Sequence, residues 1–331
     1  MMPERVKVRV KKKKNKRKII LKRILLLFFL FSIVFAGIIG YKVYKTLQAA
    51  DSSYKELDRG EKSKLRKEVV DLKKKQPFSV LLLGVEDYAT GGKGGRTDSI
   101  IVATINPKQK TMKLLSIPRD TRVEISGDTS GTKTRINSAY GKGGAQTTVE
   151  TVEKLLNIPI DYYATVDFKG FKKTIDEVGG VDVEVPFDFN EKSDTSKSKK
   201  FYFQKGNMHL NGEEALAYAR MRKQDPRGDF GRNDRQKQIL MAMLDQVSKP
   251  SNLAKIDTLA DQVSDNITTN LRITQVLALQ QIFSGFKGND VETLTLKGSD
   301  LYIGNKYFFQ PDDEELTKVQ EELYNFLYPD K

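Results

Sequence analysis

Arginine and aspartate side chains recur beside the ends of predicted strands. Arg96, Thr97 and Asp98 begin one strand, and Arg119 and Asp120 follow the end of the next. The planar guanidinium of arginine binds phosphate oxygens through paired hydrogen bonds, and carboxylates bind the hard metal ions that accompany phosphates. For Arg96 or Arg119 taken alone, an ordinary surface ion pair is the favoured explanation. Two such groups at neighbouring strand ends make an anion site an equal alternative.

The segment 218–236, YARMRKQDPRGDFGRNDRQ, concentrates the same residue types. Arg220 and Arg222 are two residues apart, so they share a face only if the backbone between them is extended. We therefore expect the preceding helix to end near Ala219. Asp225-Pro226 and Gly228 then predict a loop before the next helix.

That next helix, predicted over 232–247, is polar at its start and apolar further along. One of its faces carries, in order, Arg232, Arg235, Gln236, Ile239, Leu240 and Met243. Its N-terminus adds free N–H groups and a partial positive charge. An arginine-rich pocket with an apolar wall suits an amphiphile with a phosphorylated head, and a solvated loop of ion pairs is the alternative.

Composition excludes several other chemistries. The 331 residues include no cysteine and one histidine, His209. Zinc sites of the Cys/His kind, cysteine nucleophiles and disulfides are therefore ruled out, and a Ser-His-Asp triad would depend on His209 alone. The glycine-rich stretch 91–95 lacks the Ser or Thr that a P-loop needs after its lysine.

The elements that must position these groups alternate between strands and helices. Strands are predicted at 78–85, 98–106, 111–118, 161–168, 181–189 and 291–297, with an antiparallel turn at 106–109. Helices are predicted at 144–157, 168–180, 211–220, 232–247, 252–263, 272–286 and 312–328, and 190–200 reads as a polar loop. This alternation indicates an α/β fold with a central mixed β-sheet flanked by helices.

The N-terminal region predicts a membrane anchor. Residues 24–41 contain no charged side chain, and as a helix they would span about 27 Å of the ~30 Å hydrocarbon core. The anchor is placed at 24–44, and a cleaved signal peptide is the alternative. Residues 1–23 hold 12 Lys or Arg and one acid, which predicts a cytoplasmic N-terminus and an extracellular C-terminal domain.

The remaining chain divides into a solvated stalk at 45–76 and a domain at 77–331. Of the formal net charge of +14, residues 24–331 supply only +3, because they hold 45 basic and 42 acidic residues. A protein that reads a nucleic-acid groove should carry its Lys and Arg residues along one face of the fold. Here the positive charge lies in the N-terminal tail and the rest of the chain is nearly neutral, so no nucleic-acid partner is expected.

Ordered motifs identify a family resemblance. LLLG, GRTDS, SIPRDT, INSAYGKGG and ALAYARMRKQDPRGDFGRNDRQKQ, behind a basic N-terminal anchor, resemble the LytR-CpsA-Psr family of cell-wall enzymes, and within it the teichoic-acid transferases of Bacillus-type bacteria. The resemblance implies transfer of an anionic glycopolymer, such as wall teichoic acid, from an undecaprenyl-pyrophosphate carrier to a peptidoglycan hydroxyl. It also implies a location outside the membrane and a Mg²⁺ cofactor, with Mn²⁺ as the alternative.

The resemblance also implies roles for individual residues. Asp98 would bind the metal, together with Glu86 or Asp87, since the family's usual Asp is replaced here by Glu86. Asp229 would orient the arginines. The pyrophosphate would be held by Arg119, Arg220, Arg222 and Arg232, with Gln236 beside them, and Arg96 is a further candidate from the strand-end pattern.

Such phosphoryl transfer depends on positioning and electrostatics more than on a nucleophilic side chain, which fits this composition. The lipid tail requires an apolar slot, for which Phe171, Ile175, Ile239 and Met243 are candidates. A lipid-pyrophosphate hydrolase would use the same residues with water as acceptor. A non-catalytic wall-lipid binding module is the other alternative, whereas a DNA-binding regulator would need more cytoplasmic chain than 23 residues.

Overall fold

The computed structural model describes residues 53–86, 95–196, 198–247, 249–253, 266–283 and 290–329. The chain forms two compact units, Met1–Thr46 and Leu47–Lys331, and the described residues all belong to the second. The predicted cytoplasmic tail and membrane anchor lie outside the described residues. Within the described residues, no helix has the length and apolar character needed to span a membrane.

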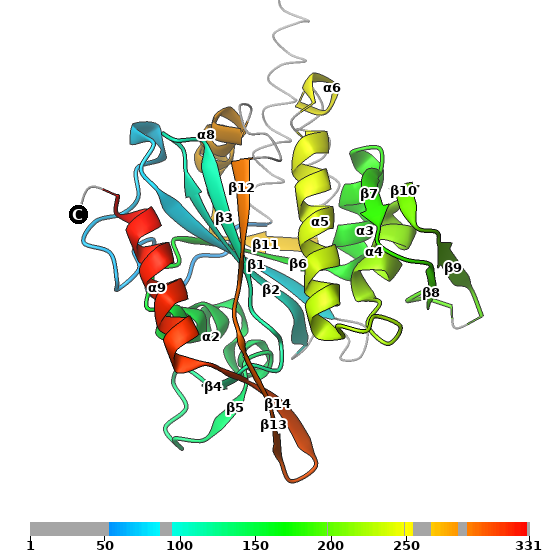
Figure 1. Cartoon of the computed structure of the whole chain (residues 1–331). Coiled ribbons are helices and arrows are strands. Elements are labelled where there is room, and N and C mark those ends of the chain that lie inside the picture. Colours follow the sequence, from blue (N-terminus) through cyan, green and yellow to red (C-terminus); the bar gives the residue numbers. More distant parts are fainter. Residues whose placement is uncertain are drawn as a thin grey trace, which may run out of the picture. The chain divides into compact units, whose positions relative to one another are not determined.

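A six-stranded mixed sheet forms the centre of the second unit (Figure 1). Strand β1 pairs antiparallel with β2 and parallel with β6, β3 pairs antiparallel with β2 and parallel with β12, and β11 pairs antiparallel with β6. The strand order is β11 (Ile267–Thr269), β6 (Tyr162–Asp167), β1 (Phe78–Glu86), β2 (Arg96–Asn106), β3 (Thr111–Ser116) and β12 (Val291–Thr295). The predicted α/β class, central mixed sheet and antiparallel β2–β3 turn are confirmed.

Both faces of this sheet are covered, which explains the continuous apolar runs of β1 and β2. Leu81 and Leu83 face the core under α2 (Ser138–Leu156) and α9 (Asp313–Leu327). Val80 and Leu82 face the opposite side, where α5 (Asp229–Val247) and α8 (Ile273–Phe283) pack. Residue alternation along β1 therefore assigns even-numbered side chains to the α5 side of the sheet.

A third cluster of buried side chains lies between α5, α3 (Phe168–Glu177) and α4 (Gly212–Arg220). The antiparallel pair β7 (Val181–Val185) and β10 (Gly206–Leu210) closes this cluster. Helix α4 begins with the predicted capping box: Asn211 accepts from the Glu214 N–H, and Glu214 accepts from the Asn211 N–H. Its N-terminus is thereby fixed.

Part of the predicted polar loop at 190–200 is a β-hairpin instead. Strands β8 (Phe189–Lys192) and β9 (Lys200–Phe203) pair antiparallel, and Phe189 and Phe203 stack with ring centroids 4.6 Å apart. Charged residues at the strand ends hide this hairpin in the sequence, whereas the buried phenylalanine pair stabilises it.

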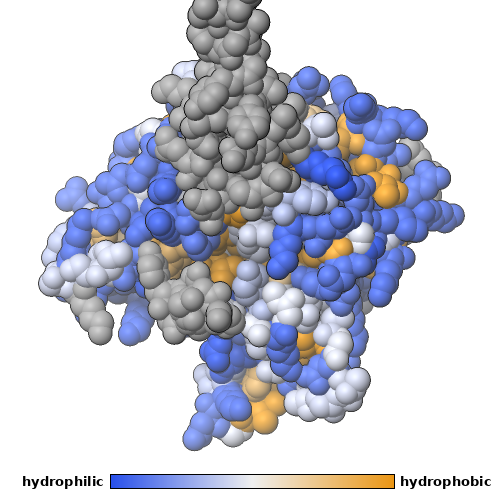
Figure 2. Space-filling view, turned by 180° about the vertical axis from the view of Figure 1, so that it is seen from behind, coloured by the Kyte–Doolittle hydropathy of each residue, from blue (hydrophilic) through white to orange (hydrophobic). Residues whose placement is uncertain are grey.

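Short elements complete the described part of the unit: η1 (Leu72–Lys74), β4 (Arg122–Glu124), β5 (Lys133–Arg135), α6 (Pro250–Leu253), β13 (Gly298–Ile303) and β14 (Lys306–Pro311). The β13–β14 hairpin extends away from the sheet and exposes Tyr302 and Ile303. Figure 2 shows an otherwise mainly hydrophilic surface on the far face, with separate hydrophobic patches.

The prediction of a solvated stalk is wrong for its described part, residues 53–76. Leu57 and Leu72 are buried. Arg59 forms an ion pair of 2.5 Å with Glu153, and Arg66 one of 2.7 Å with Asp161. Leu57 and Leu72 do not form a helical stripe, so their contacts with the domain could not be recognised from periodicity.

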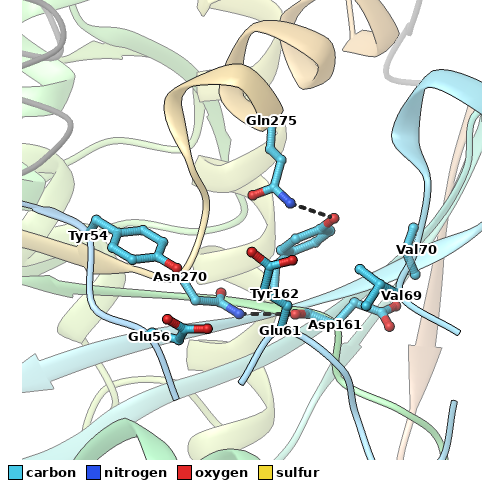
Figure 3. Close-up of a pocket in the computed structure, with 9 residues that line it drawn as sticks. All are labelled: Tyr54, Glu56, Glu61, Val69, Val70, Asp161, Tyr162, Asn270 and Gln275. Carbon is cyan, nitrogen blue, oxygen red and sulfur yellow. Dashed lines mark hydrogen bonds between the residues drawn. The ribbon is translucent and has the colours of Figure 1, made fainter. Parts of the chain in front are cut away.

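A small cavity lies where this segment meets β6 and α8 (Figure 3). Its volume is about 10 Å³, which is room for about one water molecule. Two hydrogen bonds cross it, from Asn270 Nδ2 to the Asp161 carbonyl oxygen at 3.1 Å and from Gln275 Nε2 to the Tyr162 hydroxyl at 3.4 Å. The cavity is therefore a packing feature and not a substrate site.

Candidate active site

An open cleft of about 460 Å³ lies between the sheet and the α4–α5 segment. Seven residues predicted for the site line it: Glu86, Asp98, Arg119, Arg220, Arg222, Arg232 and Gln236. Arg96 is exposed and is not among the lining residues, although it pairs with Glu86 across β1 and β2. Asp87 lies outside the described residues. The only histidine, His209, contacts Asp182 on the β7–β10 pair and does not line the cleft.

A β-bulge positions the first carboxylate. Gly84 pairs with Ser99 and Val85 pairs with Thr97, so Asp98 is the extra residue on β2. In a regular strand Asp98 would point away from the face that Ser99 occupies. The bulge places both on the α5 side of the sheet, the side that Glu86 reaches by normal alternation.

Glu86 and Asp98 form a carboxylate pair in the cleft. Burial of the Glu86 carboxyl, with the neighbouring Asp98 carboxylate and its hydrogen bond, raises the pKa of Glu86. Within the part of the chain that the structure describes, no cluster of three or more His, Cys, Asp or Glu side chains could hold a metal. Two carboxylates nevertheless fit Mg²⁺, which is commonly bound by one or two carboxylates together with substrate phosphates and water.

Arg119 lies directly beside this pair. Its Nη1 is 2.6 Å from Asp98 Oδ1, and its Nε is 3.6 Å from Asp120 Oδ2. Arg119 follows Pro118 just beyond the end of β3, next to the start of β2 in the sheet. The adjacent strand ends therefore bring Asp98 and Arg119 together, as the sequence pattern indicated.

The backbone leaves helical geometry between the two central arginines. Helix α4 ends at Arg220, and Met221 has φ −58° and ψ 131°, an extended conformation. Arg220 and Arg222 consequently both line the cleft. The guanidinium of Arg220 also lies over the Phe168 ring, 5.2 Å from its centroid, which fixes its plane.

Three arginines in the cleft keep buried N–H groups without hydrogen-bond partners within the described structure: Arg119 Nε, Arg220 Nη1 and Arg232 Nε. A buried donor without a partner is costly, and a bound anion would remove that cost. Together with the four arginines that line the cleft, these donors indicate an anion site.

Asp229 forms ion pairs with two of the arginines that line the cleft, Arg222 and Arg232. Its carboxylate is 3.4 Å from Arg222 Nη1 and 3.3 Å from Arg232 Nη2. Asp229 begins α5 and does not line the cleft. Its position suits the orienting role that the family resemblance implies.

Arg235 has a structural position that the sequence did not reveal. Its side chain and that of Asp225 are almost fully buried, and Arg235 Nη1 lies 2.5 Å from Asp225 Oδ2. Arg235 also donates to the carbonyl oxygens of Tyr218 and Met221. These contacts fasten the turn that carries Arg222 onto α5, so Arg235 supports the cleft without facing it.

Replacing Arg235 by methionine is expected to destabilise the protein by roughly 3–5 kcal/mol, because Asp225 would remain buried without a partner. The free energy of unfolding in urea measures this loss. Arg227→Met is the matched control: Arg227 is about half exposed and also pairs with Asp225, and its loss should cost about 1 kcal/mol or less. Equal losses in the two variants would contradict the structural role of Arg235.

An apolar pocket of about 270 Å³ opens beside the cleft and shares Asp98, Arg220 and Gln236 with it. Three of the four predicted slot residues, Phe171, Ile239 and Met243, line this pocket. The fourth, Ile175, is fully buried in the cluster under α3 and α4. Sequence periodicity cannot distinguish a residue that lines the pocket from one that is buried in the core, because both are apolar residues on the inner face of a helix.

The cleft has further lining residues that sequence reasoning missed. They come from the β8–β9 hairpin and from the turn after α4: Asn190, Glu191, Lys192, Lys200, Lys223 and Gln224. The Lys/Ser-rich composition of 190–200 was visible in the sequence, but nothing local placed it beside the arginines.

Most of the chain is similar to known proteins. Residues 40–325 match the LytR_cpsA_psr family model. The chain is 64% identical over 310 residues to the polyisoprenyl-teichoic acid–peptidoglycan teichoic acid transferase TagV of Bacillus subtilis, covering 93% of this chain and 79% of that protein. It is 43% identical to TagU of Halalkalibacterium halodurans, covering 88% and 93%.

Solved structures show the same similarity. The crystal structure of B. subtilis TagV superposes with a TM-score of 0.70 at 62% identity, covering 77% of this chain and 98% of that chain. The structure of YwtF (TagT) with bound octaprenyl pyrophosphate superposes with a TM-score of 0.65 at 32% identity, covering 83% and 100%.

Proposed function

The chain belongs to the LytR_cpsA_psr family, and from this membership we infer that it is a polyisoprenyl-teichoic acid–peptidoglycan teichoic acid transferase. The donor we propose is an anionic glycopolymer on an undecaprenyl-pyrophosphate carrier, and the acceptor is a peptidoglycan hydroxyl. The observation that carries this proposal is the arginine-lined cleft with three unpartnered N–H groups, which opens into an apolar pocket. An amphiphile with a pyrophosphate head fits both parts.

In the proposed reaction, a sugar hydroxyl of peptidoglycan attacks the phosphorus that carries the polymer. A new P–O bond forms, the bond to the bridging oxygen breaks, undecaprenyl phosphate leaves with that oxygen, and the hydroxyl proton passes to water. Arg119, Arg220, Arg222 and Arg232 bind the phosphate oxygens and stabilise the charge that develops on them. Gln236 lies where the apolar pocket and the arginine-lined cleft meet.

Glu86 and Asp98 are the described residues that would hold Mg²⁺, or Mn²⁺ in its place. When bound, the ion would supply charge neutralisation at the phosphate oxygens. Without an ion, Arg119 neutralises Asp98. Asp229 keeps Arg222 and Arg232 oriented towards the cleft.

Product analysis tests this function against its two rivals. The purified protein is incubated with lipid-pyrophosphate-linked polymer, with and without peptidoglycan. A transferase yields polymer joined to peptidoglycan by a phosphodiester and releases the prenyl phosphate only when the acceptor is present. Equal release without acceptor would identify a hydrolase, and binding without release would identify a lipid-binding module.

Ala164→Phe is expected to weaken binding of octaprenyl pyrophosphate by about tenfold or more. Ala164 lies on β6 opposite Leu82 and lines the apolar pocket, so a phenyl ring there would occupy space proposed for the lipid tail. Calorimetric titration measures the affinity, and inorganic pyrophosphate is the control ligand because it lacks the tail. Unchanged affinity for the lipid would place its tail elsewhere.

We also propose that the catalytic domain lies outside the cell, behind a single N-terminal anchor. The support is the apolar run 24–41, preceded by 12 basic residues against one acid. Protease added to intact protoplasts should therefore digest the domain. A domain that stays intact until the membrane is lysed would contradict this orientation.

A further inference from the structure

The cleft extends beyond the arginines in one direction. The apolar pocket shares Asp98, Arg220 and Gln236 with the cleft, whereas the β8–β9 hairpin and the turn after α4 contribute to the cleft alone. The arginines therefore lie between an apolar end and a hairpin end. Figure 1 shows β8 and β9 beside α4, on the side away from the central sheet.

Three lysines, Lys192, Lys200 and Lys223, give the hairpin end its charge, and we refer to them as the lysine edge. The cleft as a whole is lined by seven basic side chains against three carboxylates, so the lysine edge adds to an existing excess of positive charge. Glu191 is the only carboxylate that the hairpin contributes to the lining.

The lysine edge is electrostatically unfavourable without a ligand. Lys192 and Lys200 are direct cross-strand partners in the β8–β9 hairpin, and like charges at such positions repel. Among the described residues, none of the three lysines has an ion-pair partner. Nearby Lys172 and Lys199 are instead paired, with Asp194 and Glu213. The lysine edge therefore presents unpaired positive charge to the cleft.

The hairpin is held in place relative to the arginines. Gln224 Nε2 donates to the Asn190 carbonyl oxygen at 2.5 Å, and the Asn190 N–H donates to Gln224 Oε1 at 3.4 Å. Gln224 follows Arg222 in the same turn, which Arg235 fastens to α5. The lysine edge and the arginine cluster are therefore parts of one connected surface.

We propose that the lysine edge is a subsite for the phosphodiester chain of the polymer, on the side of the pyrophosphate opposite the lipid. The proposal rests on the proposed function, because it takes the donor to be lipid, pyrophosphate and anionic polymer in that order. The cleft offers an apolar pocket, an arginine cluster and a lysine edge in the same order. Lysine suits this task, since its flexible point charge can follow repeating phosphates without demanding one geometry.

The test compares two ligands and two charge-matched variants. The ligands are a short glycerol-phosphate oligomer, which has phosphodiesters but no lipid, and octaprenyl pyrophosphate, which has a lipid and pyrophosphate but no polymer. One variant combines Lys192→Gln with Lys200→Gln. The control combines Lys199→Gln with Lys205→Gln, which removes the same charge from the same region at positions that do not line the cleft.

The Lys192/Lys200 variant should bind the oligomer about tenfold more weakly than the parent, as expected for two lost charge contacts. The affinity of this variant for octaprenyl pyrophosphate should also fall less, by a factor at least about fivefold smaller than the factor for the oligomer. The control variant should bind both ligands as the parent does. Oligomer binding by the parent should also weaken as salt concentration rises, and less steeply in the Lys192/Lys200 variant.

Three outcomes would overturn the subsite. In the first, the Lys192/Lys200 variant binds the oligomer as tightly as the parent does. In the second, the control variant loses as much affinity for the oligomer as the Lys192/Lys200 variant. In the third, the parent binds octaprenyl pyrophosphate but not the oligomer. Each of these leaves the proposed transferase function intact. A parent protein that fails to bind octaprenyl pyrophosphate would instead contradict the proposed function itself, and the subsite with it.

Discussion

Asp98→Asn is expected to lower metal-dependent polymer transfer by at least about a hundredfold, because it removes a charged metal ligand while keeping the shape of the side chain. The β-bulge places this carboxylate beside Glu86 and within 2.6 Å of Arg119, so its charge acts on both the proposed ion and the arginine cluster. The initial rate of transfer is measured over a range of Mg²⁺ concentrations.

The fold should survive this change. Asp98 and Arg119 are each about one-quarter exposed, and an ion pair of that kind contributes about 1 kcal/mol or less to stability. Thermal unfolding should therefore be close to that of the parent. Asp234→Asn is the matched control, since Asp234 is half exposed on α5 and pairs with Arg227 outside the cleft. Full activity in Asp98→Asn would refute the metal assignment.

The second metal ligand can be identified in the same assay. Glu86→Gln and Asp87→Asn should differ, and the ligand is the residue whose substitution raises the Mg²⁺ concentration needed for half-maximal rate. Burial and the neighbouring Asp98 carboxylate raise the pKa of Glu86, so Glu86 is a described carboxylate that adjoins Asp98. If neither substitution changes the metal dependence, Asp98 does not share its ion with this segment.

Arg220→Lys is expected to reduce transfer by about tenfold or more, although it preserves the positive charge. A hydrogen bond to a charged partner contributes about 1.5–3 kcal/mol, and lysine cannot reproduce the planar pair of donors. Arg220 also stacks on Phe168 and retains a buried N–H without a partner, so its geometry is fixed towards an anion. Arg222→Lys should show a loss of the same kind.

Arg227→Lys provides the control for both substitutions. Arg227 belongs to the same arginine-rich turn, is about half exposed, and pairs with Asp225 and Asp234. It does not line the cleft, so transfer should continue at the parent rate. If Arg220→Lys and Arg222→Lys also transfer polymer at the parent rate, bidentate binding of pyrophosphate by this pair is wrong.

Local sequence was sufficient for the main elements and for part of the site. Apolar runs bounded by Pro and Gly located β1, and the Asn211/Glu214 pair located the start of α4. The two-residue spacing of Arg220 and Arg222 predicted a helix end near Ala219 if both serve one site, and the helix ends at Arg220. These features depend on neighbours within a few residues, so the chain itself carries the information.

Features that depend on distant partners were decided only by the tertiary structure. Asp98 reaches the cleft because pairing with β1 creates a bulge, and Arg235 is structural because Asp225 and the Met221 carbonyl surround it. The spacing of arginines alone could not separate Arg235 from Arg232, since both lie on the buried side of α5.

The same distinction applies to the apolar and lysine-rich segments. Ile175 and Ile239 have the same pattern on their helices, but only Ile239 borders an open pocket, because packing leaves space there. Lys192 and Lys200 became part of the cleft through the Phe189–Phe203 stack and the Asn190–Gln224 contacts. Sequence determined which groups could bind a phosphorylated amphiphile, and long-range packing decided which of them face one cavity.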